Sequence, residues 1–443
     1  MAIVLVIYFF EGLLCTLIGM PSASPDTCEI VSLVLMLVNS VILVIYVTKR
    51  YKIYGKAVVS VLVLSVLLKV FLILWDYYGT SIFVLPNSHS DTEEYHWTGM
   101  NYALYGMRVR NYGLLVGVIY KLFGVQRMTA QYLNVVFSFI GISFFERTML
   151  LLELSRQTRE KTMKFAALLP NYLIISAILL RECLISMIVA ISLYCFAQWW
   201  KKGNSIKLLF AFAISLSACY FHSGAVAVTV GYAVVVILTK TQQSGGRKFD
   251  ISIKSVLFAV LFFFGFMFLF TRYSDSLFKR FGGMSVEVID QYIEGHDFYG
   301  TRTTPGRNSK YYAGISGYTG LAGILINSPI RTIYFLWVPM PWDIRGLGDI
   351  IAFLGSSLFY GGTMFSAIFS LVKRKNISRD KTLLFAIMSI ALCGAFVFAW
   401  GTESAGSALR HREKFYFAYL LLYGVLKQFK EGLPRKSIVS ESV

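Results

Sequence analysis

Three acidic side chains within four positions, Asp91, Glu93 and Glu94, are the residues of this sequence best suited to proton transfer. They follow a long apolar run and precede a polar segment that is rich in aromatic residues. Charge is costly next to a bilayer, so such acids need either water or a function. A carboxylate can accept a proton from a hydroxyl group when crowding by like charges favours its protonated form. Asp91 is therefore the first candidate for a catalytic residue, and Glu94 is the second. The alternative interpretation is that the acidic cluster is only a solvated loop between two membrane spans.

Two histidines at the ends of apolar runs are further candidates for the catalytic base. His222 lies in the tight turn Phe-His-Ser-Gly, and His411 stands between Arg410 and Arg412. An imidazole has an ordinary pKa of about 6.5, which suits proton transfer near neutral pH. Histidines at helix ends also serve as structural residues, so both interpretations remain open.

Arginines that flank the apolar runs are the candidate ligands for an anion. A guanidinium group can bind two phosphate oxygens at once, which a lysine cannot do. The alternatives are anchors to lipid headgroups or ion pairs with adjacent acids such as Glu182 and Glu413. The candidates for binding a diphosphate are Arg181, Arg410, Arg412, Arg108, Arg110, Arg302 and Arg307.

The composition predicts an all-α, polytopic integral membrane protein that forms a helical bundle. Of its 443 residues, 56% are hydrophobic and 15% are charged. The apolar residues come in runs of roughly the length that crosses a bilayer as a helix. These runs predict about 12 transmembrane helices in a single transmembrane domain, residues 1–443. The predicted spans are 3–19, 30–48, 57–75, 130–150, 165–180, 183–200, 208–222, 223–239, 255–271, 348–372, 382–400 and 414–428.

Two long connections between these spans are expected on the extracytoplasmic side. The first, 76–129, holds the acidic cluster, and its segment 112–125 is expected to lie along the membrane interface or to re-enter it. The second, 272–347, mixes tyrosines, glycines and cations, which suits a cap or a lid over a substrate. Its last part, 318–342, is a second expected interfacial helix.

The distribution of charge predicts the orientation of the spans. With the N- and C-termini in the cytoplasm, the entire net charge of +18 falls in the cytoplasmic connections, as the positive-inside rule requires. The basic balance therefore indicates orientation and not binding to nucleic acid. Within the first three spans, Glu11 and Lys69 are expected to form an ion pair, because opposite charges in lipid attract one another.

Motifs of several other protein classes are missing from the sequence. It contains no phosphate-binding loop after a strand, no zinc-protease motif and no serine-hydrolase motif. The six cysteines have no metal-binding or redox spacing and are expected to be small core residues. We therefore expect neither a metal nor a cofactor.

Three short motifs and the predicted layout together resemble known enzymes. The motifs are similar to the first half of polytopic glycosyltransferases of the GT-C type. They are Ser90-Asp91 with Tyr95, the segment 111–124, and Leu179-Leu180-Arg181-Glu182. The long late outer loop and the pair Arg410 and Arg412 before the last span resemble the bacterial polymerases of the Wzy type, which make O-antigen or capsular polysaccharide. The acidic motif reads Asp-Thr-Glu-Glu, so the resemblance does not assign the family's acid to one position.

This resemblance implies an enzyme of the bacterial inner (plasma) membrane that polymerises oligosaccharide repeat units linked to undecaprenyl diphosphate. Arginines would hold the diphosphate, an acid or a histidine would deprotonate the acceptor, and no cofactor would be needed. The implied partners are the lipid-linked oligosaccharide, the lipid bilayer and a chain-length regulator. The alternatives are a GT-C transferase that uses a monosaccharide on polyprenyl phosphate, or a flippase for lipid-linked oligosaccharides. Charges gathered on one predicted face favour chemistry there over a flippase, in which charges would line the spans.

Overall fold

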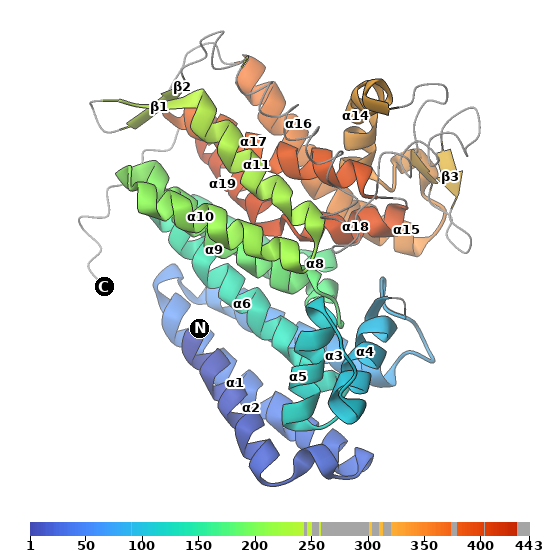
Figure 1. The fold of residues 1–443 in the computed structure, drawn as a ribbon. Helices are drawn as coiled ribbons and strands as arrows, with labels where there is room; N and C mark the ends of the chain where they lie inside the picture. The colour runs from blue at the N-terminus through green and yellow to red at the C-terminus, as the bar shows by residue number, and fades with distance from the viewer. Residues whose placement is uncertain are drawn as a thin grey trace. The chain divides into compact units, whose positions relative to one another are not determined.

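The computed structural model describes nine segments of the chain and is all-α apart from two short hairpins (Figure 1). Most of the predicted outer connection 272–347 lies outside the described residues, and so do Ser90, Arg307 and, apart from residue 257, the predicted span 255–271. The described residues are 1–89, 91–242, 246–249, 257, 301–303, 310–312, 320–373, 379–402 and 404–431.

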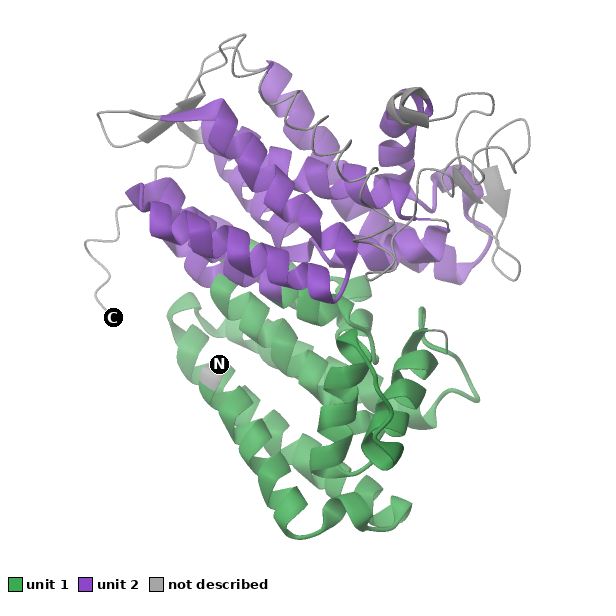
Figure 2. Cartoon of the chain, in the orientation of Figure 1, with its two compact units in different colours: residues 1–144, 160–187 green, residues 145–159, 188–443 purple. Residues whose placement is uncertain are grey.

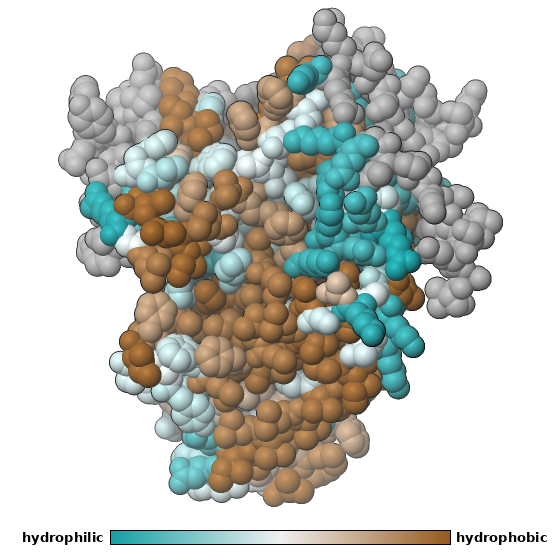
Figure 3. All heavy atoms as spheres, turned by 180° about the vertical axis from the view of Figure 1, so that it is seen from behind, coloured by the Kyte–Doolittle hydropathy of each residue, from teal (hydrophilic) through white to brown (hydrophobic). Residues whose placement is uncertain are grey.

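The prediction of a helical membrane protein is confirmed, whereas the predicted number of spans is not. Among the described residues, six helices are long and apolar enough to cross a membrane, and four more apolar helices are shorter. Many large apolar side chains on these helices are exposed, as one face of the molecule shows (Figure 3). The six long helices are Pro25–Tyr54, Lys56–Tyr78, Arg127–Leu151, Glu182–Lys202, Leu347–Lys373 and Lys381–Trp400.

The chain divides into two compact units (Figure 2). Unit 1 comprises residues 1–144 and 160–187, and unit 2 comprises residues 145–159 and 188–443.

Unit 1 is built from the helices of the first part of the chain. The exposed apolar side chains of α1 to α3, such as Phe10, Leu37 and Leu67, suit contact with lipid. The helices are α1 (Ala2–Leu17), α2 (Pro25–Tyr51), α3 (Lys56–Tyr78), α4 (Asp91–Tyr105), α5 (Asn111–Phe123), most of α6 (Arg127–Leu151), most of α7 (Arg156–Leu168) and α8 (Pro170–Ile175), with 3-10 turns at Met20–Ser22 and Lys52–Tyr54.

The acidic cluster begins a helix, α4, and not the loop that we predicted. Asp91, Glu93 and Glu94 occupy its first turn, where carboxylates are stabilised by the positive end of the helix dipole. The helix packs closely on α5 because glycines face the neighbouring helix. A Cβ atom on Gly99 would lie 2.5 Å from Cγ1 of Val116, and one on Gly117 would lie 2.6 Å from the ring of Tyr102. This packing fixes the position of the acidic turn.

The predicted span 165–180 is not one helix. Helix α7 ends at Leu168 and α8 begins at Pro170, because a proline inside a helix removes a hydrogen bond and clashes with the preceding turn. After α8, the side-chain amide of Asn134 donates to the carbonyl oxygens of Ile178 and Leu180, at 2.8 and 2.9 Å. These bonds hold the turn that presents Arg181.

The expected ion pair between Glu11 and Lys69 is wrong. Nδ2 of Asn39 donates to Oε2 of Glu11, while Nζ of Lys69 donates to Oγ of Ser138 at 2.6 Å. The ammonium of Lys69 also lies 4.7 Å from the ring centroid of Phe139. Polar and aromatic neighbours thus satisfy each charge separately, which a sequence pattern cannot specify.

Unit 2 contains the helices of the second part of the chain. Its close contacts again use glycine, since a Cβ atom on Gly231 of α11 would lie 2.8 Å from Cα of Ile390 on α17. Its helices are α9 (Glu182–Lys202, beginning in unit 1), α10 (Ser205–Ser217), α11 (Val226–Leu238), α14 (Gly320–Trp337), α15 (Leu347–Ala352), α16 (Leu358–Lys373), α17 (Arg379–Trp400), α18 (Ala405–Glu413) and α19 (Tyr416–Glu431). The shorter elements are the 3-10 turns Ala218–Tyr220, Ser223–Ala225 and Pro341–Asp343, the π-helical turn Phe353–Ser357, and the antiparallel pairs β1 (Thr239–Gln242) with β2 (Gly246–Phe249) and β3 (Thr301–Thr303) with β4 (Lys310–Tyr312).

Replacing Gly99 with alanine should loosen the packing of α4 on α5. The added methyl group would overlap Val116, and overpacking of this kind costs about 1–3 kcal/mol, more than the helix propensity gained. We expect a lower melting temperature for Gly99→Ala in detergent-solubilised protein. Gly362→Ala is the matched control, because Gly362 lies in α16 with open space around it. Equal melting temperatures for the two variants would contradict the packing described for α4.

Candidate functional site

A polar cavity of about 400 Å³ lies within unit 1. This volume falls in the range of about 300–1,000 Å³ that is common for small-molecule sites. Both polar and aromatic side chains form its wall. The lining residues are Pro25, Glu29, Asp76, Tyr77, Thr80, His89, Glu93, His96, Trp97, Val125, Gln126 and Arg127.

The cavity is formed where several helices begin or end. Asp76 lies in the last turn of the apolar helix α3, Glu93 in the first turn of α4, and Arg127 is the first residue of α6. Glu93, His96 and Trp97 are three and four residues apart, so they share one face of α4. The end of α3 and the beginnings of α4 and α6 thus bring charged groups together outside the apolar length of α3 and α6.

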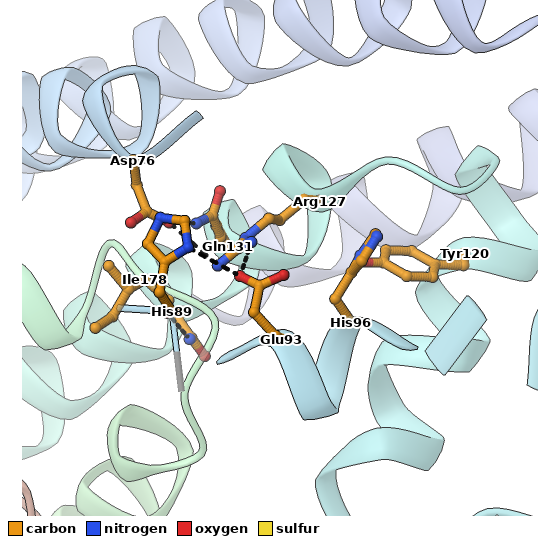
Figure 4. A network of polar contacts seen from close by, with 9 residues as sticks. Asp76, His89, Glu93, His96, Tyr120, Arg127, Gln131 and Ile178 are labelled. Carbon is orange, nitrogen blue, oxygen red and sulfur yellow. Dashed lines mark hydrogen bonds and ion pairs between the residues drawn. The ribbon is translucent and has the colours of Figure 1, made fainter. Parts of the chain in front are cut away.

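Arg127 links two carboxylates that come from different helices (Figure 4). Its Nη1 lies 2.5 Å from Oε1 of Glu93, and its Nη2 lies 3.5 Å from Oδ2 of Asp76. Nδ1 of His89 is 4.0 Å from the same oxygen of Glu93. The side chain of Glu93 is 34% exposed and that of Arg127 is 12% exposed, so water screens the carboxylate more than the guanidinium.

Asp76 is the most deeply buried acid of the cavity, with 4% of its surface exposed. Nε2 of Gln131 on α6 donates to its Oδ2 at 2.6 Å. Within the described residues, its other oxygen, Oδ1, has no hydrogen-bond partner in the protein. A buried carboxylate oxygen of this kind favours a ligand that can donate a hydrogen bond.

The surroundings of His96 favour its neutral form. Burial lowers the pKa of its imidazole, the positive charge of Arg127 lowers it further, and Glu93 partly opposes both effects. Its Nδ1 is 2.7 Å from the hydroxyl oxygen of Tyr120. The ring therefore offers the cavity an uncharged hydrogen-bonding group.

The structure distinguishes among the predicted residues of unit 1. Glu94 is exposed, and Arg108 and Arg110 are exposed in the link between α4 and α5. Asp91 is partly buried in the first turn of α4 and is not among the residues that line the cavity. The guanidinium carbon of Arg181 lies 5.9 Å from the ring centroid of Tyr95, one helical turn after Asp91. Within unit 1 the Arg181 turn thus contacts the acidic helix, but neither Arg181 nor Asp91 lines the cavity.

The two predicted histidines meet within unit 2. The ring centroids of His222 and His411 are 5.1 Å apart, and each ring lies 5.0 Å from Phe398. Nδ1 of His222 accepts a hydrogen bond from the backbone N–H of Gly224, so its neutral form is protonated at Nε2. The hydroxyl of Thr402 donates to a backbone carbonyl, which leaves its oxygen to accept from Nδ1 of His411 at 3.1 Å. The two imidazoles therefore carry their protons on different nitrogens.

The predicted arginines of unit 2 have different surroundings. Arg410 is partly buried on α18, while Arg412 is fully buried and donates to the carbonyl oxygens of Leu336 and Val338 at 2.6 and 2.7 Å. Arg412 thus ties α18 to the end of α14. The backbone of Arg302 pairs with Tyr311 in the β3–β4 hairpin, and Arg307 lies outside the described residues.

Asp76, His96 and Arg127 were not predicted from the sequence, and Glu93 was not distinguished from the neighbouring acids. A helical interpretation of 91–105 would have placed Glu93, His96 and Trp97 on one face. Arg127 stands at the predicted outer end of a span, against the positive-inside rule, which was a usable signal. The bridge between Asp76 and Glu93 could not be found in this way, because it depends on how α3, α4 and α6 pack.

The described residues contain no group of three or more histidine, cysteine or acidic side chains placed to hold a metal ion. The lining combines three carboxylates, a guanidinium and two imidazoles, which are groups that take part in acid–base chemistry. Glu93 can take up a proton while Asp76 keeps the guanidinium of Arg127 paired.

Replacing Arg127 with methionine should destabilise the protein, because it leaves the carboxylate of Asp76 buried without its cation. Loss of one partner of a buried pair costs about 3 kcal/mol, and most of this cost arises at Asp76, since water screens the partly exposed Glu93. Adding Asp76→Asn should restore part of the free energy of unfolding. Arg108→Met, at an exposed arginine, is the control and should change it by less than about 0.5 kcal/mol. Equal losses in the Arg127 and Arg108 variants would refute the bridge.

The lowered pKa of His96 predicts a loss of stability in mild acid. Above the ordinary pKa of about 6.5 the ring is neutral in both the folded and unfolded states, so it adds no pH dependence. As the pH falls below that value the unfolded state takes up the proton first. The penalty to folding therefore grows until the pH passes the lower folded pKa, and it stays constant below that pH. Unfolding of wild type and of His96→Gln, measured between neutral and mildly acidic pH, should therefore differ in slope below about pH 6.5. Parallel curves would show that His96 is not held neutral.

The geometry of the cavity is thus the basis for assigning a function. Comparisons of the chain with models of protein families, with curated proteins and with solved structures find no match.

Proposed function

We propose that this protein is a membrane glycosyltransferase that transfers a polyprenyl-diphosphate-linked oligosaccharide to an acceptor sugar outside the cytoplasm. The observation that carries the proposal is the carboxylate of Glu93 beside Arg127 and Asp76, in a cavity at the ends of membrane helices. The acid belongs to the first large connection, where the resemblance to GT-C enzymes leads us to expect one. The polymerisation of O-antigen or capsular repeat units is the specific form of this proposal.

Glu93 is the proposed base in place of Asp91 or Glu94, because it is the member of the acidic turn that lines the cavity. In this mechanism Glu93 takes the proton of an acceptor hydroxyl as the oxygen attacks the anomeric carbon of the donor. The bond between that carbon and the diphosphate oxygen breaks. Polyprenyl diphosphate leaves with the electron pair, so atoms and charge balance.

Arg127 and Asp76 are proposed to stabilise the change of charge on Glu93. A carboxylate that is paired with a guanidinium is a weak base, because protonation leaves the guanidinium without its anion. Glu93 can therefore accept a proton more readily if Arg127 keeps a second anion. Asp76 is that anion, since its Oδ2 already lies 3.5 Å from Nη2 of Arg127. As Glu93 becomes neutral, Arg127 stays paired and buried charge is not left uncompensated.

Arg181 is the proposed ligand of the donor diphosphate. It belongs to the turn that packs on Tyr95 of the acidic helix. Arg412 is left out of this proposal, because its guanidinium binds carbonyl oxygens of its own chain. His222 and His411 are an alternative site for the base in unit 2.

The proposal includes a placement in the membrane. It assumes about a dozen spans, both termini in the cytoplasm and the cavity facing away from it, in the bacterial inner membrane. The net charge of +18, all of it in the connections assigned to the cytoplasm, supports this orientation. A separate chain-length regulator remains part of the proposal.

Glu93→Gln should abolish transfer, whereas Glu94→Gln should preserve it. The first change removes the base from the cavity, and the second changes an exposed acid in the same helical turn. Loss of a general base costs about 10²- to 10⁴-fold in rate. The measurement is the length of the outer polysaccharide in cells that depend on this chain, with protein abundance in the membrane measured for each variant.

The pattern of products distinguishes the proposed enzyme from a flippase. An inactive polymerase leaves single repeats on the outer acceptor, whereas an inactive flippase leaves none. Arg181→Ala should give single repeats while the protein still inserts in the membrane. Long polymer in the Glu93→Gln strain, or complete loss of outer repeats, would reject the assignment.

A further inference from the structure

The cavity of unit 1 has a strongly acidic lining. Three carboxylates, Glu29, Asp76 and Glu93, face one guanidinium, that of Arg127. The hydroxyls of Tyr77 and Tyr78 donate to Glu29, while Asp76 and Glu93 share Arg127. A diphosphate in this cavity would meet an excess of negative charge at short range. The lining therefore opposes an anionic ligand.

A cation is also a poor match for the cavity. Arg127 lies between the two carboxylates that a cation would need, and it already neutralises part of their charge. Oδ1 of Asp76, which is almost completely buried, accepts no hydrogen bond from the described protein. A hydroxyl group suits these surroundings, because it donates to a carboxylate and accepts from a guanidinium or an amide without bringing charge.

Aromatic side chains add an apolar wall to the same cavity. Trp97 lines it and is 55% exposed, next to His96 at 5.9 Å between ring centroids. Tyr77 lines it from α3. A flat, exposed aromatic face beside carboxylates is chemically matched to a ring that has C–H groups on its faces and hydroxyls on its edge.

We propose that this cavity binds an uncharged sugar, with hydroxyls on Asp76 and Glu93 and one ring face on Trp97. This inference rests on the proposed function only in assigning the sugar the role of acceptor, and it places the donor diphosphate elsewhere. The binding itself follows from the lining.

The test uses the full chain, purified in detergent, and a panel of uncharged methyl glycosides as probes. Saturation-transfer NMR should show saturable binding of at least one glycoside. Asp76→Asn should weaken its affinity about tenfold, as loss of one charge-assisted hydrogen bond predicts. Trp97→Ala, which changes an exposed side chain and so spares folding, should also weaken it, and Glu94→Gln should not. An excess of inorganic pyrophosphate or of spermidine should leave the glycoside signal in place.

The outcomes separate this inference from the proposed function. Three results would overturn the sugar site. They are the absence of saturable binding for every glycoside of the panel, equal binding by wild type and Trp97→Ala, and displacement of the glycoside by pyrophosphate or by spermidine. If cells make polymer with the wild-type protein and lose it with Glu93→Gln, but no glycoside binds in the cavity, the sugar site alone is rejected. In the opposite outcome, the glycoside binds in a manner that depends on Asp76 and Trp97, while cells that lack the protein make normal polysaccharide. That result would reject glycosyl transfer and retain the sugar site.

Discussion

The contact of Arg127 with Asp76 and Glu93 is the interaction on which the rest of unit 1 depends. Each of these charges would be costly to bury alone, and together they leave one negative charge among three groups. The contact also joins the end of α3 to the beginnings of α4 and α6, which are far apart in sequence. A bridge of this kind determines where α4 can lie, and thereby directs His96 and Trp97 toward the cavity. Structure and acid–base chemistry therefore depend on the same three side chains.

The helical membrane fold follows from properties that are local in sequence. Runs of apolar residues predict α2, α3 and α6, because a backbone in lipid must satisfy its hydrogen bonds internally. The secondary structure of the acidic turn was harder to predict, because Asp91, Glu93 and Glu94 suit a solvated loop and a helix N-terminus equally well. The helix is favoured by the glycine-lined packing of α4 on α5, which involves residues that are distant in sequence, such as Gly99 and Val116. Sequence patterns therefore identified the acidic segment but not which of its acids faces the cavity.

The arginines show how much the role of one residue type depends on its partners. Arg127 lines a cavity and binds carboxylates, whereas Arg412 is buried against carbonyl oxygens at the end of α14. Arg331 uses its guanidinium in the same manner as Arg412, donating to the carbonyls of Ala399 and Thr402. From the sequence, Arg410 and Arg412 were both predicted to bind a diphosphate, because both flank the same apolar run. Distinguishing a structural arginine from a ligand-binding one required the positions of the carbonyl groups.

The cavity is acidic although the protein as a whole is strongly basic, and these facts are compatible. The net charge of +18 lies in the connections that the topology assigns to the cytoplasm. Salt screens such exposed charges beyond about 8–10 Å, so a ligand in the cavity responds mainly to the groups that line it. Among these, Glu29, Asp76 and Glu93 outnumber Arg127. The positive-inside rule relates global charge to orientation, whereas the lining decides which ligand suits the cavity. A strongly basic chain can therefore hold a cavity that opposes anions and that we propose binds an uncharged sugar.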